Sequence, residues 1–178
     1  IEASWEFLDV ARIREEGIWG PFHEIGHNHQ FYDTVLPGTT EATVNLWSVY
    51  INEEILGRDR NISIDALVPE DRDRRRADYL ATGPDFAQWS VWTALETYLQ
   101  LQEAFGWQFY VDLFGEYRMI SNAEAPTEDA QRINEWVIRS SQRAGFDLGP
   151  FYEAWGFPMS NAARNQMAIL PEWLENPM

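Results

Sequence analysis

Residues 21–30 read PFHEIGHNHQ and residues 40–50 read TEATVNLWSVY. These two stretches predict a pair of helices around which the rest of the chain is arranged. Pro21 suits the first turn of a helix, and Thr39 or Thr40 is a residue type that caps the start of a second one. We expect two helices joined by a loop of about ten residues, which lets the second helix fold back antiparallel to the first.

Outward from this pair, Gly and Pro residues separate further helical patterns. No convincing alternating strand pattern appears, and the best candidate, NISIDALV at 61–68, is short. We therefore predict a mainly α protein whose residues 1–178 form a single domain. The further helices are expected at 1–16, 69–83, 84–106, 107–118, 128–144 (capped by Thr127) and 149–156, with a loop at 57–68 and a coil with one turn at 158–178.

The composition narrows the possible functions. Of the 178 residues 45% are hydrophobic, and nine are Trp, which excludes a disordered chain. The net charge of -16 would repel phosphate backbones, so we expect no nucleic-acid partner. With no cysteine, any transition-metal site must use His, Asp and Glu. No run of ~18 apolar residues occurs, so no membrane span is expected.

The three histidines of the chain all fall between positions 23 and 29, and two of them have the HExxH spacing. Residues i and i+4 lie on one face of a helix, so His23 and His27 can both bind one zinc ion. Glu24 projects beside the ion, where a carboxylate can take a proton from a metal-bound water. Gly20 and Gly26 would let other backbone approach the site closely.

A catalytic zinc site needs a third protein ligand and an open position. Glu41, in the first turn of the second helix, is the favoured candidate. It could instead be an ordinary first-turn acid that complements the helix dipole. The carboxylates ranked behind it are Glu53, Glu54 and Asp33.

Two further polar residues flank these ligands. Asn45 lies one turn after Glu41 on the same face, where its amide could hydrogen-bond the far nitrogen of a zinc-bound histidine. His29 is turned about 200° from His27 on the helix, so we expect it to point away from the metal and to pack, cap or contact substrate.

Aromatic residues offer further candidates for substrate contact and for catalysis. Most tryptophans fall inside helical patterns and are expected to pack in the core, whereas Trp19 and Trp47 lie near the metal-binding segments and could stack against sugars. A tyrosine near a catalytic zinc site could stabilise the oxyanion that forms when the metal-bound water attacks a carbonyl group. The candidates are Tyr50, Tyr79 and Tyr98.

The pair WGPFHEIGHNHQ (19–30) and TEATVNLWSVY (40–50) resembles the enhancin-like, mucin-degrading zinc peptidases. The similarity continues in YLQLQEAFGWQFYVDLFGEYR (98–118) and LGPFYEAWGFPMS (148–160), so it covers most of residues 17–160. It implies a gluzincin-type catalytic domain with His23, His27 and Glu41 as zinc ligands and Glu24 as base. It also implies a secreted or cell-surface protein that acts on mucin-type O-glycoproteins.

Zincins usually place a β-sheet before the active-site helix, but only 22 residues precede His23. We therefore expect this chain to be the helical subdomain of a larger catalytic domain, with the sheet in upstream domains of the same parent protein. The expected function is zinc-dependent endopeptidase activity on glycoproteins. Two rival hypotheses are a glycan-binding or adhesion module with a vestigial metal site, and a structural zinc in a helical interaction domain.

Overall fold

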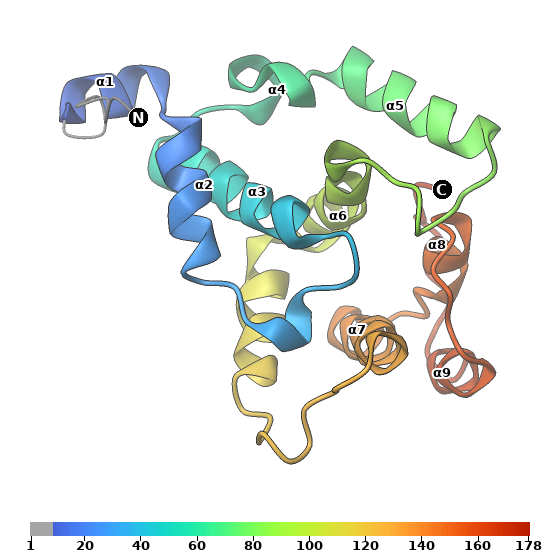
Figure 1. Ribbon diagram of the computed structural model, residues 1–178. Helices are drawn as coiled ribbons and strands as arrows, with labels where there is room; N and C mark the ends of the chain where they lie inside the picture. Colours follow the sequence, from blue (N-terminus) through green and yellow to red (C-terminus); the bar gives the residue numbers. More distant parts are fainter. Residues whose placement is uncertain (1–8) are drawn as a thin grey trace.

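The computed structural model describes residues 9–178, and helices dominate this part of the chain (Figure 1). No β-strand occurs over residues 9–178, where an isolated bridge pairs Asp147 with Glu172. The prediction of a mainly α protein is confirmed. The elements are α1 Val10–Glu16, α2 Trp19–His27, η2 Tyr32–Thr34, α3 Thr40–Tyr50, η3 Ile51–Ile55 (a π-helical turn), α4 Arg60–Ser63, η4 Asp65–Leu67, α5 Pro69–Ala81, α6 Val91–Tyr117, α7 Asp129–Ala144, α8 Gly149–Ala154 and α9 Asn161–Met167.

Helix α3 is the central element, because it packs against α2 on one side and against α6 on another (Figure 1). Seven of its residues, from Ala42 to Val49, are buried. Large side chains of α6, α7 and α8 complete the core, among them Tyr98, Leu99, Trp136, Phe151 and Trp155. Helix α2 therefore packs on a helix that is itself largely buried and held by α6.

Helix α6 joins two of the expected helices across a kink. Gly106 has non-helical backbone angles, φ 75° and ψ 173°, which a residue with a Cβ rarely adopts. The helix begins at Val91 rather than at 84, because the Ser90 side chain accepts a hydrogen bond from the Thr93 amide and caps it there. Phe86, in the segment expected to be helical, instead packs against Trp89 and Phe157.

Short capped helices account for most other differences from expectation. The 57–68 segment contains α4 and η4, and Asp59 caps α4 by accepting from the Asn61 amide. Ser160 likewise caps α9 within the expected coil at 158–178. Helix α7 is capped by Glu128 in a capping box with Gln131, not by Thr127. Of the helix expected at 1–16, residues 1–8 lie outside the described residues.

A buried ion cluster fastens α5 to α6. Glu96 is fully buried, and its carboxylate accepts from Arg72 at 2.9 Å and from Arg75 at 2.8 Å. Arg60, also buried, pairs with Glu53 of the π-helical turn. Within residues 9–178, no helix is both long and apolar enough to cross a membrane.

Candidate metal centre

Gly26 allows α2 and α3 to touch. A Cβ built on Gly26 would lie 3.0 Å from the Val44 carbonyl oxygen and 3.1 Å from the Val44 Cβ, so only glycine fits there without displacement. The close approach expected at Gly26 is therefore present. At Gly20 nothing lies within 4 Å of such a Cβ, and the same expectation there is wrong.

This contact brings three donor side chains together. His23 and His27 lie one turn apart on α2 with ring centroids 5.0 Å apart. The Oε2 atom of Glu41 lies 2.9 Å from His23 Nε2 and 3.9 Å from His27 Nε2. One donor atom from each residue lies within 4.8 Å of the others, and the Glu41 side chain is half exposed, which leaves the cluster open to solvent.

The donor set fits a zinc ion. Two imidazole nitrogens and one carboxylate oxygen are a known three-ligand combination for catalytic zinc. Ligands at zinc–ligand distances of about 2.0–2.2 Å in a tetrahedron are roughly 3.3–3.6 Å apart, between the two Glu41 distances above.

The other candidate carboxylates do not join this cluster. Glu53 forms a salt bridge with Arg60. Within residues 9–178, the side chains close enough together to hold one metal ion are His23, His27 and Glu41. The expected first-turn position of Glu41 is confirmed, since α3 begins at Thr40. Thr39 precedes the helix but does not cap it through its side chain, because its hydroxyl donates to the Leu36 carbonyl at 2.8 Å.

Each histidine directs its second nitrogen to a side-chain amide. His23 Nδ1 lies 2.8 Å from Asn45 Oδ1, the contact expected from the position of Asn45 on α3. His27 Nδ1 lies 3.0 Å from Gln30 Oε1. Sequence reasoning did not single out Gln30. It lies three residues after His27 and beyond the end of α2, where helical spacing gives no signal.

Glu24 lies between the two histidines in sequence, and its side chain is exposed. It is turned by about 100° from His23 around α2, so it does not share the ligand face. His29 points elsewhere, as expected. Its ring lies over Trp47, with centroids 5.1 Å apart.

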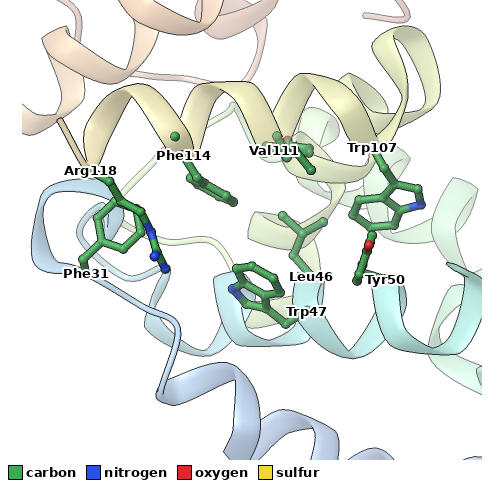
Figure 2. A pocket seen from close by; sticks show the side chains of 10 residues that line it. Phe31, Leu46, Trp47, Tyr50, Trp107, Val111, Phe114 and Arg118 are labelled. Atoms are coloured by element: carbon green, nitrogen blue, oxygen red, sulfur yellow. The ribbon is translucent and has the colours of Figure 1, made fainter. Parts of the chain in front are cut away.

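A second concavity, separate from the histidine–glutamate cluster, lies between α3 and α6 (Figure 2). Trp47 and Phe114 stack across it, and Arg118 stands at its edge over the Phe31 ring. Asn45 faces the cluster, whereas Trp47 and Tyr50 line the pocket on another side of the same helix. The pocket has a volume of about 250 Å³ and is lined by Phe31, Leu46, Trp47, Tyr50, Trp107, Tyr110, Val111, Phe114, Gly115 and Arg118.

The remaining aromatic candidates lie in packed positions. Trp19 packs against Trp92, with ring centroids 5.7 Å apart. Tyr98 is 1% exposed, and the Tyr79 hydroxyl donates to the Trp155 carbonyl at 2.9 Å. The described structure therefore places Tyr79 and Tyr98 in the core and Tyr50 in the aromatic pocket, and brings none of them to the histidine–glutamate cluster.

Comparisons with known proteins agree on one family. Residues 1–156 match the model of the family described as Peptidase M60, enhancin and enhancin-like. The chain is 46% identical over its whole length to TRPM8 channel-associated factor 2 of Homo sapiens, and 43% identical to a TRPM8 channel-associated factor homolog of Xenopus laevis. It spans about a fifth of these relatives, 19% and 20% of their lengths.

A solved structure shares the fold. It is the crystal structure of a functionally unknown conserved protein from Bacillus anthracis str. Ames. The TM-score is 0.81 at 26% sequence identity, and the match covers 99% of this chain and 38% of that one.

Proposed function

Because this chain belongs to the enhancin-like peptidase family, we propose that it is the helical part of a zinc-dependent endopeptidase catalytic domain. The observation that carries the proposal is the convergence of His23, His27 and Glu41 donor atoms within 4.8 Å. These residues would hold the zinc ion. Glu24, exposed beside them, is available as a base.

The chain's own residues have distinct parts in this proposal. Bound zinc would lower the pKa of a water molecule and polarise the scissile carbonyl. Glu24 takes the proton of the attacking water and returns it to the leaving amine. Asn45 orients His23 by accepting a hydrogen bond from its Nδ1–H, which leaves Nε2 free for the metal.

The expected substrate class follows from the resemblance to the enhancin-like family. We propose glycoproteins, in particular mucin-type O-glycoproteins, as substrates, a secreted or cell-surface location, and no nucleic-acid partner. The chain spans about a fifth of its curated relatives. We propose that upstream domains of the same parent protein supply the rest of the substrate cleft.

Metal analysis tests the core of the proposal. Purified protein prepared without chelator should carry one zinc per chain, and His23→Ala or His27→Ala should lose it. The parent protein should then cleave an O-glycosylated mucin-type substrate faster than its deglycosylated form. Absence of stoichiometric zinc from the wild-type protein would reject the metal site, whereas equal cleavage of both substrates would reject only the glycan preference.

A second candidate function is a binding module in which the metal site is vestigial. The observation that favours it is the 46% identity to a protein named as a TRPM8 channel-associated factor, a name that describes association rather than hydrolysis. A glycan-binding or adhesion role belongs to the same class. If the parent binds a glycoprotein or a channel equally well with Glu24 intact or replaced, and cleaves nothing, this candidate replaces the peptidase.

A further inference from the structure

Gln30 connects the first metal-binding helix to the second. Its Oε1 atom lies 3.0 Å from His27 Nδ1. Its Nε2 atom donates to the Thr40 carbonyl at 2.7 Å and to the Thr43 hydroxyl at 2.5 Å. We propose that Gln30 is a positioning residue that fixes the tautomer of His27 and ties this ligand to the helix that carries Glu41. The proposal rests on the zinc site proposed above.

The orientation of the Gln30 amide follows from its partners on α3. The Thr40 carbonyl can only accept a hydrogen bond, so the group that faces it must be the NH2 of the amide. The Thr43 hydroxyl lies 3.1 Å from both the Thr39 and the Thr40 carbonyls, to which it donates, and so it also presents a lone pair to Gln30. Both contacts require the same amide orientation, with Oε1 turned to His27.

The tautomer of His27 follows in turn. Since Gln30 Oε1 can only accept, His27 Nδ1 must carry the proton and donate it. In a neutral imidazole the other nitrogen, Nε2, then holds the lone pair. This is the nitrogen that lies 3.9 Å from Glu41 Oε2, on the side where the donor atoms converge.

The same amide also restrains how the two helices meet. Thr40 and Thr43 flank Glu41 in the first turn of α3, whereas His27 is the last residue of α2. One side chain therefore bridges both ends of the 28–39 connection. Loss of the bridge frees the His27 ring and loosens the first turn of α3, so zinc affinity should fall by about 10–100-fold, as for other groups that orient a ligand.

The test reads the tautomer directly, in the chain without metal. Long-range ¹⁵N–¹H NMR at about pH 8, where an ordinary histidine is neutral, distinguishes the two tautomers, and the chain has three histidines to assign. Wild type should show His27 as the Nδ1–H form. Gln30→Leu, which removes the acceptor, should shift it toward Nε2–H. Gln142→Leu, an exposed glutamine on α7, is the matched control.

Zinc affinity, measured with zinc alone against a competing chelator, supplies the second readout. Gln30→Leu should lose affinity and Gln142→Leu should not. The proposal is overturned if His27 keeps its wild-type tautomer in Gln30→Leu, even if that variant is less stable. Should Gln30→Leu fail to fold, the wild-type spectrum decides, because an Nε2–H form of His27 contradicts the geometry. Failure of wild type to bind zinc would reject the metal site but leave the tautomer result standing.

Discussion

Glu24 and Glu41 are both exposed carboxylates, yet only Glu41 contacts the two imidazoles. The difference arises from the elements that carry them. Glu24 shares α2 with the histidines and is rotated away from their face, whereas Glu41 approaches from α3. At the scale of single residues, the two acids should therefore respond differently to substitution.

Glu24→Gln should keep both zinc and fold but lose peptide cleavage in the parent protein. The ligands stay in place, while the proton acceptor is removed, and general-base catalysis typically supplies about 10²–10⁴-fold in rate. Zinc content and kcat measured on the same preparation check this outcome. Cleavage at the wild-type rate by Glu24→Gln would reject the assignment of the base.

Glu41→Gln should lower zinc affinity sharply, because a neutral amide replaces a charged ligand. Glu54→Gln is the matched control, since Glu54 is an exposed acid on the π-helical turn that follows the same helix. Chelator competition on the two variants gives the comparison. Equal affinities would mean that Glu41 is only a first-turn acid.

Helical periodicity indicates that His23 and His27 share a face that Glu24 does not, whereas Glu41 was expected from the antiparallel return of the second helix and from the family resemblance. Helical spacing also suggested Asn45, whose Oδ1 does contact His23. Gln30 was out of reach for a physical reason. Its three partners lie on two helices and become neighbours only through the path of the 28–39 connection.

At the scale of elements, the contact between α2 and α3 depends on the absence of a side chain at Gly26. Gly26→Ala should separate the helices by a few tenths of an ångström and cost about 1–3 kcal/mol of stability, as overpacking usually does. Zinc affinity should fall with it, because the donors sit on both sides of that contact.

Gly20→Ala is the control on the same helix. Nothing lies within 4 Å of its added Cβ, so the variant should be neutral or more stable by about 0.5–1 kcal/mol through helix propensity. Urea unfolding and chelator competition on both variants check the pair. A Gly26→Ala protein as stable and as zinc-competent as Gly20→Ala would show that the contact is not tight.

The longer helices could be predicted from apolar periodicity or from start and stop signals, such as Gly145 after α7 and Pro69 at the start of α5. The short α8, expected at 149–156, is also present, but α4 and α9 were not expected. Helices α4 and α9 have four and seven residues, too few for periodicity to register, and they persist through side-chain caps from Asp59 and Ser160. The kink at Gly106 was read as an end because a glycine marks both.

At the scale of the whole molecule, the Glu96 cluster should contribute strongly to stability. Glu96→Gln removes the charge that pairs with Arg72 and Arg75 in a fully buried position, which should cost about 3–5 kcal/mol. Asp73→Asn, which breaks an exposed pair with Arg76, should cost less than about 1 kcal/mol. The free energy of unfolding in urea separates them, and similar losses would contradict the special role of the cluster.

Buried tyrosines should make the fold sensitive to alkali. Burial raises the pKa of Tyr98, Tyr117 and Tyr152 above the ordinary value of 10.0, so the folded protein holds these protons more tightly than the unfolded chain. Their stabilisation is complete below the unfolded pKa and is lost as the pH rises toward the folded values. The free energy of unfolding should therefore fall above about pH 10. Tyrosinate absorbance from these residues should appear only with unfolding.

All the residues assigned to the metal lie between positions 23 and 45, while the helix that buries α3 begins only at Val91. During synthesis the amino-terminal part of a chain leaves the ribosome first. A nascent chain thus exposes its complete set of donors long before α6 exists to hold them. The candidate donors are therefore synthesised before the helix that holds α3 in place, so their final geometry has to wait until α6 has emerged.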